Sequence, residues 1–296
     1  YLGSGLSILL VALILKLINV EGTWTLPFFG EIFPWQSVFF IVGLPGLLIV
    51  LLIALTVREP ERQNAQKAAV TFQQVKVYYF ANRKAILCLF FGIAFMAFGS
   101  YATTSWTPTL FVRHYGLTES QAGLLLGGIV TVFATGGVLF GGRYGDRLTK
   151  QGYPDAKMRV GFIGMSGGVI IALLILLLFT LTSAPLKVFV VLLALSSFVT
   201  SIPYGAATAA VQEMIPAPMR ATFSALFLFV VNIIGLGGGP LMVGFLNDKL
   251  FHDPNQVHLS LAITLVFAFG LSCLLLYSGL KAFIQSTENA RLEMAE

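Results

Sequence analysis

Charged residues are scarce in this sequence, and their scarcity excludes whole classes of protein. Asp, Glu, Lys and Arg make up only 10% of the 296 residues, whereas a soluble domain carries about 25%. So few charges could not cover a water-soluble globule of this length, which excludes a soluble enzyme, a nucleic-acid-binding protein and a disordered chain. The 57% of hydrophobic residues and the mean hydropathy of +0.87 predict a polytopic membrane protein instead.

Cysteine and histidine are also rare, which removes two further possibilities. Cys88 and Cys273 each lie within an apolar run, so we expect neither a disulfide framework nor a thiolate metal site. The three histidines, His114, His252 and His258, are scattered or in a loop on the predicted outer side. They form no catalytic group of the kind that a membrane-embedded transferase needs. The sequence therefore predicts a protein that is not an enzyme, with no cofactor and no metal.

Long apolar runs are what the sequence has instead. Eight runs are long enough to span a bilayer, which takes roughly 20 residues; they lie at about 1–20, 37–57, 85–112, 120–141, 160–183, 187–211, 220–246 and 258–283. These runs are continuously apolar, whereas the strands of a membrane barrel alternate over about 10 residues. We therefore predict an all-α polytopic membrane protein with eight transmembrane helices.

Basic residues predict the orientation. If the chain starts on the cytoplasmic side, fourteen Lys and Arg residues fall in cytoplasmic segments and four in outer segments. This bias predicts a multi-pass protein with a cytoplasmic C-terminus. Trp24 and Trp35 fall in the first outer loop, as an interfacial aromatic belt requires. The absence of targeting segments, glycosylation sequons and long tails favours a bacterial inner membrane.

A polar, mixed-charge stretch divides the helices into two groups. We predict residues 1–57 as the last two helices of an N-terminal lobe, 58–84 as a cytoplasmic inter-lobe linker, and 85–296 as a C-terminal six-helix lobe with a short cytoplasmic tail. The linker has room for one interfacial amphipathic turn around Phe72 to Phe80. Because the chain opens at Tyr1 inside an apolar run, we expect about four helices of a twelve-helix protein to precede it. A native eight-helix protein is the alternative.

The segment Gly142–Lys150, between the predicted fourth and fifth helices, combines glycine with charge. Gly142 would let two helices approach closely at a tight turn. Asp146 would interact with the N-terminus of a neighbouring helix and with an arginine, while Arg147 and Lys150 would face the anionic leaflet. A basic turn that only fixes topology explains the same residues.

The spacing of glycine, aspartate, arginine and lysine in this segment resembles the cytoplasmic signature loop of the major facilitator superfamily, in its second-half copy. Four further strings are similar to the Spinster branch of that superfamily: Val57–Arg62, Trp106–Gly116, Pro216–Ala221 and Asn232–Pro240. The resemblance covers nearly the whole chain. It implies helices five to twelve of a twelve-helix transporter whose two lobes open a central cavity alternately to either side.

The resemblance also implies roles for particular residues. Asp146, with Arg147, Arg143 and Gly142 in the same segment, would hold the lobes in one state by pairing across helix ends. No Asp, Glu, Lys, Arg or His lies in the middle third of any predicted helix, although ion or proton coupling usually needs such a group. We therefore expect the coupling residues to belong to the helices that precede Tyr1, where the Spinster branch has its key charges.

Polar and aromatic side chains on helix faces are the candidates for substrate contact. They are Ser100, Thr103, Thr104 and Trp106 in run 85–112, Tyr204 after a proline in run 187–211, and Phe229 and Asn232 in run 220–246. An amide at mid-span must find a partner in a helix, in water or in a substrate, because unsatisfied polarity is costly there. Packing is the favoured interpretation of the threonines, and packing or lipid contact that of Phe229. For Asn232 and Trp106 both interpretations stay open.

These features together predict a monomeric secondary active transporter that works by alternating access. A lobe that is apolar, aromatic and poor in charge suits an amphipathic or lipid-like solute, such as a lysolipid or a sphingoid-like lipid, as the Spinster resemblance also suggests. The alternative is the same fold transporting a small organic anion or sugar acid, which would need Arg or Lys in the cavity. The expected partners are membrane lipids and the substrate, with protons coupled through residues outside this chain, and no nucleic acid.

Overall fold

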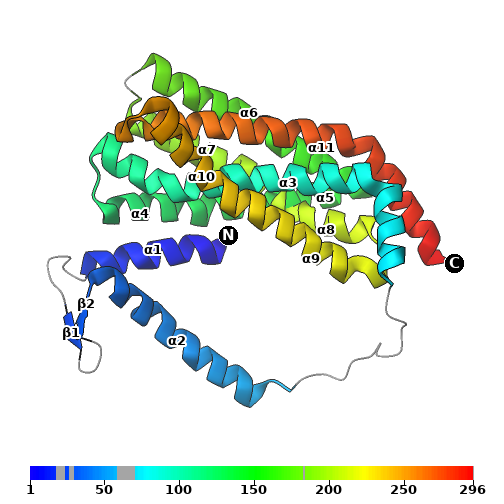
Figure 1. Ribbon diagram of the computed structural model, residues 1–296, viewed down its shortest axis with the longest axis horizontal. Helices are drawn as coiled ribbons and strands as arrows, with labels where there is room; N and C mark the ends of the chain where they lie inside the picture. Colours follow the sequence, from blue (N-terminus) through cyan, green and yellow to red (C-terminus); the bar gives the residue numbers. More distant parts are fainter. Residues whose placement is uncertain (18–23, 27–29, 59–70, 183, 296) are drawn as a thin grey trace.

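Helices form almost all of the part of the chain that the computed structural model describes, which is residues 1–17, 24–26, 30–58, 71–182 and 184–295 (Figure 1). In chain order they are α1 (Leu2–Leu17), α2 (Pro34–Thr56), α3 (Phe72–Tyr115), α4 (Glu119–Ile129), α5 (Thr135–Lys150), α6 (Ala156–Leu181), α7 (Leu186–Ser201), α8 (Tyr204–Met214), α9 (Arg220–Val231), α10 (Gly239–Phe245) and α11 (Val257–Ala295). The π-helical turns Val130–Ala134 and Asn232–Gly238 join α4 to α5 and α9 to α10, and a third, Leu246–Phe251, follows α10.

Seven helical stretches among the described residues are long and apolar enough to cross a membrane, where the sequence predicts eight. The first predicted helix is α1, which is described over 16 residues; the last residues of that prediction, 18–20, lie outside the described part. The prediction of an all-α polytopic membrane protein is confirmed. A small hairpin, which the sequence analysis missed, pairs β1 (Trp24–Leu26) with β2 (Gly30–Ile32) in antiparallel register.

Two long helices, α3 and α11, pack against each other through the centre of the bundle (Figure 1). Glycine makes this contact close, because a Cβ at Gly99 would lie 2.3 Å from the ring of Phe269. A buried hydrogen bond adds to it: the Ser272 hydroxyl donates to the Gly92 carbonyl at 2.6 Å. The other helices of the C-terminal group surround this pair.

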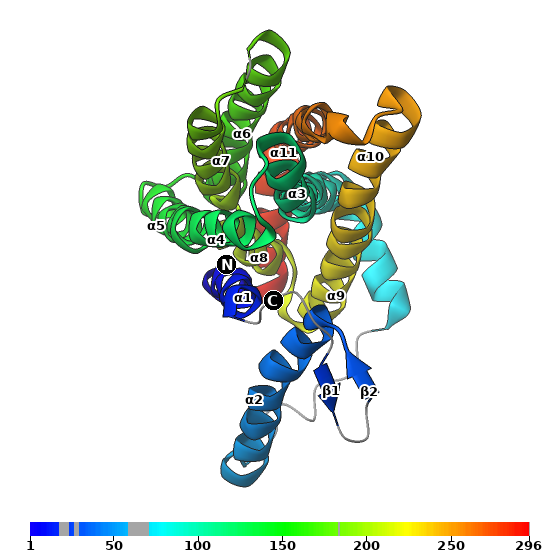
Figure 2. The ribbon, with the colours of Figure 1, turned by 90° about the vertical axis from the view of Figure 1, so that its left-hand side faces the viewer.

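The two N-terminal helices meet the bundle differently. α1 crosses α4, where a Cβ at Gly127 would lie 2.9 Å from the backbone nitrogen of Leu9. The Ser120 hydroxyl of α4 donates to the Ala12 carbonyl of α1 at 3.1 Å. By contrast, α2 extends away from the bundle (Figure 2), and none of the residues in its most apolar stretch is buried.

The predicted linker is partly helical. α3 begins at Phe72, so the predicted amphipathic turn is the first part of a helix, and its backbone leaves helical geometry only at Asn82 (φ −111°, ψ 15°). Residues 59–70 of the linker lie outside the described part of the chain. In the predicted first outer loop, residues 18–23 and 27–29 also lie outside it. The aromatic belt expected from Trp24 and Trp35 therefore stays a prediction.

The segment Gly142–Lys150 is the C-terminal part of α5, so the prediction of a tight turn there is wrong. The glycine just before this segment serves helix packing: a Cβ at Gly141 would lie 2.0 Å from the Ile202 carbonyl oxygen. Gly145 is buried as well. The chain turns only after Lys150, where Gly152 has a φ of +85° that favours glycine.

Candidate substrate cavity

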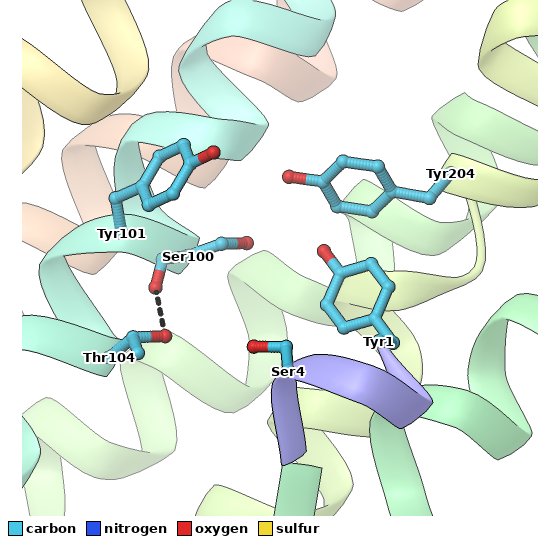
Figure 3. A pocket seen from close by; sticks show the side chains of 6 residues that line it. All are labelled: Tyr1, Ser4, Ser100, Tyr101, Thr104 and Tyr204. Atoms are coloured by element: carbon cyan, nitrogen blue, oxygen red, sulfur yellow. Dashed lines mark hydrogen bonds between the residues drawn. The ribbon is translucent and has the colours of Figure 1, made fainter. Parts of the chain in front are cut away.

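A cavity of about 260 Å³ opens between α1, α3 and α8 (Figure 3). Its lining consists of Tyr1 and Ser4 at the start of α1, Ser100, Tyr101 and Thr104 of α3, and Tyr204 at the start of α8. Each of these side chains carries a hydroxyl group, and none carries a charge. Among the described residues, the cavity is therefore lined by uncharged side chains that present hydroxyl groups between apolar and aromatic surface.

Helix breaks and close helix contacts bring Tyr204 to this cavity. Pro203 lies in the turn that separates α7 from α8, so Tyr204 begins a new helix. A Cβ at Gly205 would lie 2.7 Å from the Val138 carbonyl oxygen of α5, so glycine lets α8 lie against α5. On the other side, Tyr1 meets Tyr204 edge to face, with ring centroids 4.9 Å apart at 65°.

The hydroxyl groups of the tyrosines point into the cavity. Those of Tyr101 and Tyr204 face each other across it, with the Tyr1 hydroxyl close by (Figure 3). The Thr104 hydroxyl donates to the Ser100 carbonyl at 3.0 Å, and the Ser100 hydroxyl itself points toward the cavity. Aromatic rings with hydroxyl tips can hold a solute by ring contact and hydrogen bonding, without a charged partner.

Three of the seven predicted cavity residues, Ser100, Thr104 and Tyr204, line this cavity together. Thr103 is close in sequence, but its hydroxyl donates to the Gly99 carbonyl of its own helix at 2.8 Å. The indole nitrogen of Trp106 donates to the Pro240 carbonyl at 2.9 Å, which ties α3 to α10. That bond fits the packing interpretation of Trp106.

Phe229 and Asn232 lie away from this cavity. Phe229 belongs to α9 and Asn232 to the π-helical turn after it, and both side chains are exposed. The Asn232 amide donates to the Leu228 carbonyl one turn earlier, at 2.8 Å. This bond satisfies part of its hydrogen-bonding capacity within its own helix. A substrate role for the two residues stays a prediction.

Tyr1, Ser4 and Tyr101 also line the cavity, although they are not among the residues predicted from the sequence. A weak signal was present, because Tyr1 and Ser4 are spaced to share one helix face and Tyr101 follows Ser100 directly. The placement of α1 beside α3 and α8 depends on how α1 fits against α4. Spacing along one helix could not reveal that.

Two further hollows lie along α1 and α3 beyond this cavity. One, of about 210 Å³, is lined by Ser7, Ile8, Val11 and Ala12 of α1 and by Glu119 and Gly123 of α4. The other, of about 400 Å³, is lined by Pro108, Thr109, Val112 and Arg113 of α3 and by Glu119. Ser100, Thr104, Pro108 and Val112 recur every four residues and so share one face of α3. This face leads from the hydroxyl groups at mid-helix to the charges of Arg113 and Glu119.

The predicted gating residues lie at the end of α5. Arg143, Asp146 and Arg147 are exposed, and Gly142 is half-buried beside Gly205. Among the described residues, no ion pair involves Asp146. A role in pairing two lobes therefore stays a prediction.

Two other ion pairs are present at this end of the bundle. Lys157 of α6 pairs with Glu213 of α8 at 3.0 Å, and both side chains are largely buried. Arg159 pairs with Asp155 at 2.9 Å, and its guanidinium lies 4.6 Å from the centre of the Tyr153 ring. These contacts stabilise the turn between α5 and α6 and its contact with α8, and the sequence analysis did not single them out.

The fold and the cavity define a polytopic helical membrane protein with a solute-sized space between its helices. A family model described as Major Facilitator Superfamily matches residues 2–240. The chain belongs to the Major Facilitator Superfamily, which confirms the membership expected from the sequence.

Two curated relatives are similar over parts of the chain. An MFS-type efflux pump of Mycolicibacterium smegmatis is 26% identical over 242 residues, which cover 79% of this chain and 53% of that protein. The uncharacterized transporter YybO of Bacillus subtilis is 26% identical over 172 residues, covering 52% of this chain and 39% of YybO. The chain thus spans about half the length of the curated relatives that it matches.

Solved structures of a bacterial homologue of the human lysosomal transporter Spinster share the fold. The inward-facing, unoccupied form superposes with a TM-score of 0.59 at 21% identity, covering 97% of this chain and 65% of that one. The inward-facing, occupied form gives a TM-score of 0.56 at 20% identity, covering 96% and 64%. The fold expected from the Spinster resemblance is therefore confirmed.

Proposed function

We propose that this chain is part of a secondary active transporter that moves an amphipathic or lipid-like solute across a membrane by alternating access. The observation that carries this is the cavity of hydroxyl groups and aromatic rings between α1, α3 and α8. The protein would lie in a bacterial inner membrane as a monomer, with its C-terminus in the cytoplasm. Coupling to protons would use residues outside this chain.

The surroundings of the cavity support a solute with both a polar and an apolar part. The hydroxyl groups of Tyr1, Tyr101 and Tyr204 can bind a polar head, while their rings can contact an apolar tail. The hollow between α1 and α4 adds apolar surface from Ile8 and Val11, and Glu119 lies in the same lining. A solute that is only polar would leave the apolar surfaces without a matching partner, and one that is only apolar would leave the hydroxyl groups without one.

The relatives support transport as the class of activity. The similar protein of Mycolicibacterium smegmatis is an efflux pump. The similar solved structures are of a Spinster homologue in inward-facing forms, one unoccupied and one occupied. Neither name identifies the solute that this chain would carry.

The alternative, a small organic anion or sugar acid, has less support. Such a solute would need a cationic side chain at its binding site, and no Lys or Arg is among the described residues that line the 260 Å³ cavity. Arg113 is the cation that lines a hollow, and it donates to the Pro254 carbonyl at 3.1 Å.

Competition in liposomes separates the two solutes. The purified protein is reconstituted, and uptake of a labelled lysophospholipid is measured in the presence of unlabelled lysophospholipid or of short organic anions. We expect only the unlabelled lysophospholipid to compete. If a labelled anion is taken up, and lysophospholipid does not reduce that uptake, the amphipathic solute is rejected in favour of the alternative.

We also propose that Asp146 takes part in switching between the two accessible states. Its exposed carboxylate at the end of α5 leaves it able to pair with a cation of another lobe. A cysteine in place of Thr104 reports which side reaches the cavity, by labelling with a membrane-impermeant maleimide from either side. Asp146→Asn should shift the ratio of labelling from the two sides, while Glu288→Gln, at an exposed acid near the end of α11, should not. Equal ratios in all three proteins would show that Asp146 only sets topology.

A further inference from the structure

The first part of α3 is set at an angle to the rest of the helix. Residues Phe72 to Asn82 turn away from the direction of the other long helices (Figure 1). The change of direction occurs at Asn82, where the backbone leaves helical geometry. The Asn82 amide donates to the Tyr78 carbonyl at 3.2 Å, which supports the bend. The first three turns of α3 therefore lie across the end of the bundle.

One face of this segment is bound to the bundle. Val75, Tyr78, Tyr79 and Asn82 follow the spacing of one helix face, and all four are buried or half-buried. The Tyr78 hydroxyl donates to the Met214 carbonyl at the end of α8. Its ring packs edge to face on Phe223 of α9, with centroids 5.7 Å apart. The inner face thus holds the segment against the junction of α8 and α9.

The opposite face combines exposed apolar rings with positive charge. Phe72, Val77 and Phe80 have 82%, 62% and 54% of their surface exposed. The basic side chains Lys76, Arg83 and Lys84 are exposed beside them, and no ion pair among the described residues involves them. Aromatic and apolar side chains of this kind enter the membrane interface, and Lys and Arg beside them can extend their charged ends to the headgroups.

We propose that the outer face of Phe72–Lys84 binds the headgroups of anionic lipids, and that this contact stabilises the α8–α9 junction through Tyr78. The rings enter the boundary between headgroups and acyl chains, while the three cations contact negative headgroups. The orientation of the segment agrees with this, because it lies across the membrane-spanning helices and not along them (Figure 1).

The lipid contact would act on the α8–α9 junction, which lies at one end of a helix that reaches the substrate cavity. The junction already holds two other bonds, from the Arg220 guanidinium to the Ile215 carbonyl at 3.0 Å and from Lys157 to Glu213. α8 also carries Tyr204 at its other end, in the substrate cavity. A lipid contact that fixes the junction therefore acts on the helix that forms one wall of the cavity.

The first test measures lipid contact on the outer face. Gln73→Cys, introduced in a variant without Cys88 and Cys273, carries an environment-sensitive fluorophore in nanodiscs of phosphatidylcholine with increasing phosphatidylglycerol. We expect the emission to shift to the blue as phosphatidylglycerol rises, and the shift to weaken at high salt. Lys76→Gln, Arg83→Gln and Lys84→Gln together should weaken binding of the face to anionic lipid by roughly fivefold for each cation removed, so the shift should be lost at phosphatidylglycerol fractions that shift the unaltered protein.

A matched loss of charge at the other end of the bundle serves as the control. Lys16→Gln, Lys187→Gln and Lys249→Gln remove three exposed cations there and should leave the response unchanged. Emission that is equally blue-shifted in phosphatidylcholine alone would reject anionic headgroups as the partner. A probe that stays in water in every mixture would assign the face to a protein partner and would also overturn the proposal.

The second test measures the effect on the junction. Amide hydrogen exchange in residues 214–219 should slow when phosphatidylglycerol is added. Tyr78→Phe keeps the ring on Phe223 but removes the bond to Met214, so it should retain the fluorescence response and lose the slowing of exchange. Tyr79→Phe, one residue further along, should retain both. Exchange that is insensitive to phosphatidylglycerol in the unaltered protein would overturn the link to the junction.

Discussion

The two N-terminal helices, α1 and α2, are alike in composition and opposite in packing. α2 contains the most apolar of the seven membrane-spanning stretches, yet none of the residues in that stretch is buried. α1 is shorter, but it crosses α4 closely enough to bury Gly5 and Ala12. Hydropathy therefore indicates that both helices belong in a membrane, and it says nothing about which of them finds a helix partner.

Small residues explain the difference only when both helices supply them. A Cβ at Gly5 would lie 2.3 Å from the Thr131 hydroxyl oxygen, and one at Gly123 would lie 2.9 Å from the Ala12 Cβ. α2 also has glycines, Gly43 and Gly46, but nothing lies within 4 Å of a Cβ at either. In a membrane, helices associate mainly through close contact of this kind, because lipid tails are as apolar as leucine.

The largest expected effect comes from filling the α1–α4 contact. Gly127→Leu would place a side chain against Leu9, whose backbone nitrogen is 2.9 Å from the added Cβ. Overpacking of this kind costs about 1–3 kcal/mol or more, so α1 should separate from α4. The separation is measured as lost disulfide formation between Ala12→Cys and Ser120→Cys, which replace residues joined by a hydrogen bond.

The neighbouring glycine gives a matched control. A Cβ at Gly128 would meet nothing within 4 Å, so Gly128→Leu should leave the cross-link intact. If both variants lose the cross-link equally, a general effect on α4 is responsible, and close packing does not distinguish α1 from α2.

The cavity gives the next effect, because the docking of α1 places Tyr1 beside Tyr204. Tyr204→Phe keeps the ring and removes a hydroxyl that points into the cavity. Loss of one hydrogen bond to the solute, worth about 0.5–1.5 kcal/mol, should reduce the apparent affinity for a lysophospholipid roughly two- to tenfold. Tyr277→Phe, at an exposed position of α11, should leave transport unchanged. Equal losses in both would place the solute elsewhere.

The same contrast shows what a sequence of this kind can predict. Run length and hydropathy predicted the membrane helices, because both depend on local chemistry. Run 187–211 was predicted as one helix, and the structure divides it into α7 and α8 at Pro203. Ser100 and Thr104 were predicted from their spacing on one helix face, and the structure places them together. Whether substrate contacts them is the part that transport measurements must decide.

What could not be predicted depends on partners across helices. Tyr1 and Ser4 became cavity residues only because α1 docks on α4, which no pattern within α1 encodes. The glycines at positions 141, 142 and 145 suit a turn and a close helix contact equally well, and the Ile202 carbonyl beside Gly141 decides for the contact. The hairpin of β1 and β2 is too short for an alternating pattern to indicate it.

The smallest expected effect tests whether polarity adds to the α1–α4 contact. Ser120→Ala removes the hydrogen bond to the Ala12 carbonyl, and such bonds between membrane helices contribute about 0.6 kcal/mol on average. Ser7→Ala removes a hydroxyl of α1 that bonds only within its own helix, to the Ser4 carbonyl, and should have no effect on docking. Labelling of a cysteine in place of Ala12, which is buried in this contact, detects separation of the helices in both variants. If Ser120→Ala labels as slowly as Ser7→Ala, close contact of small residues alone holds α1 to α4, a kind of contact that the described residues do not give to Gly43 and Gly46 of α2.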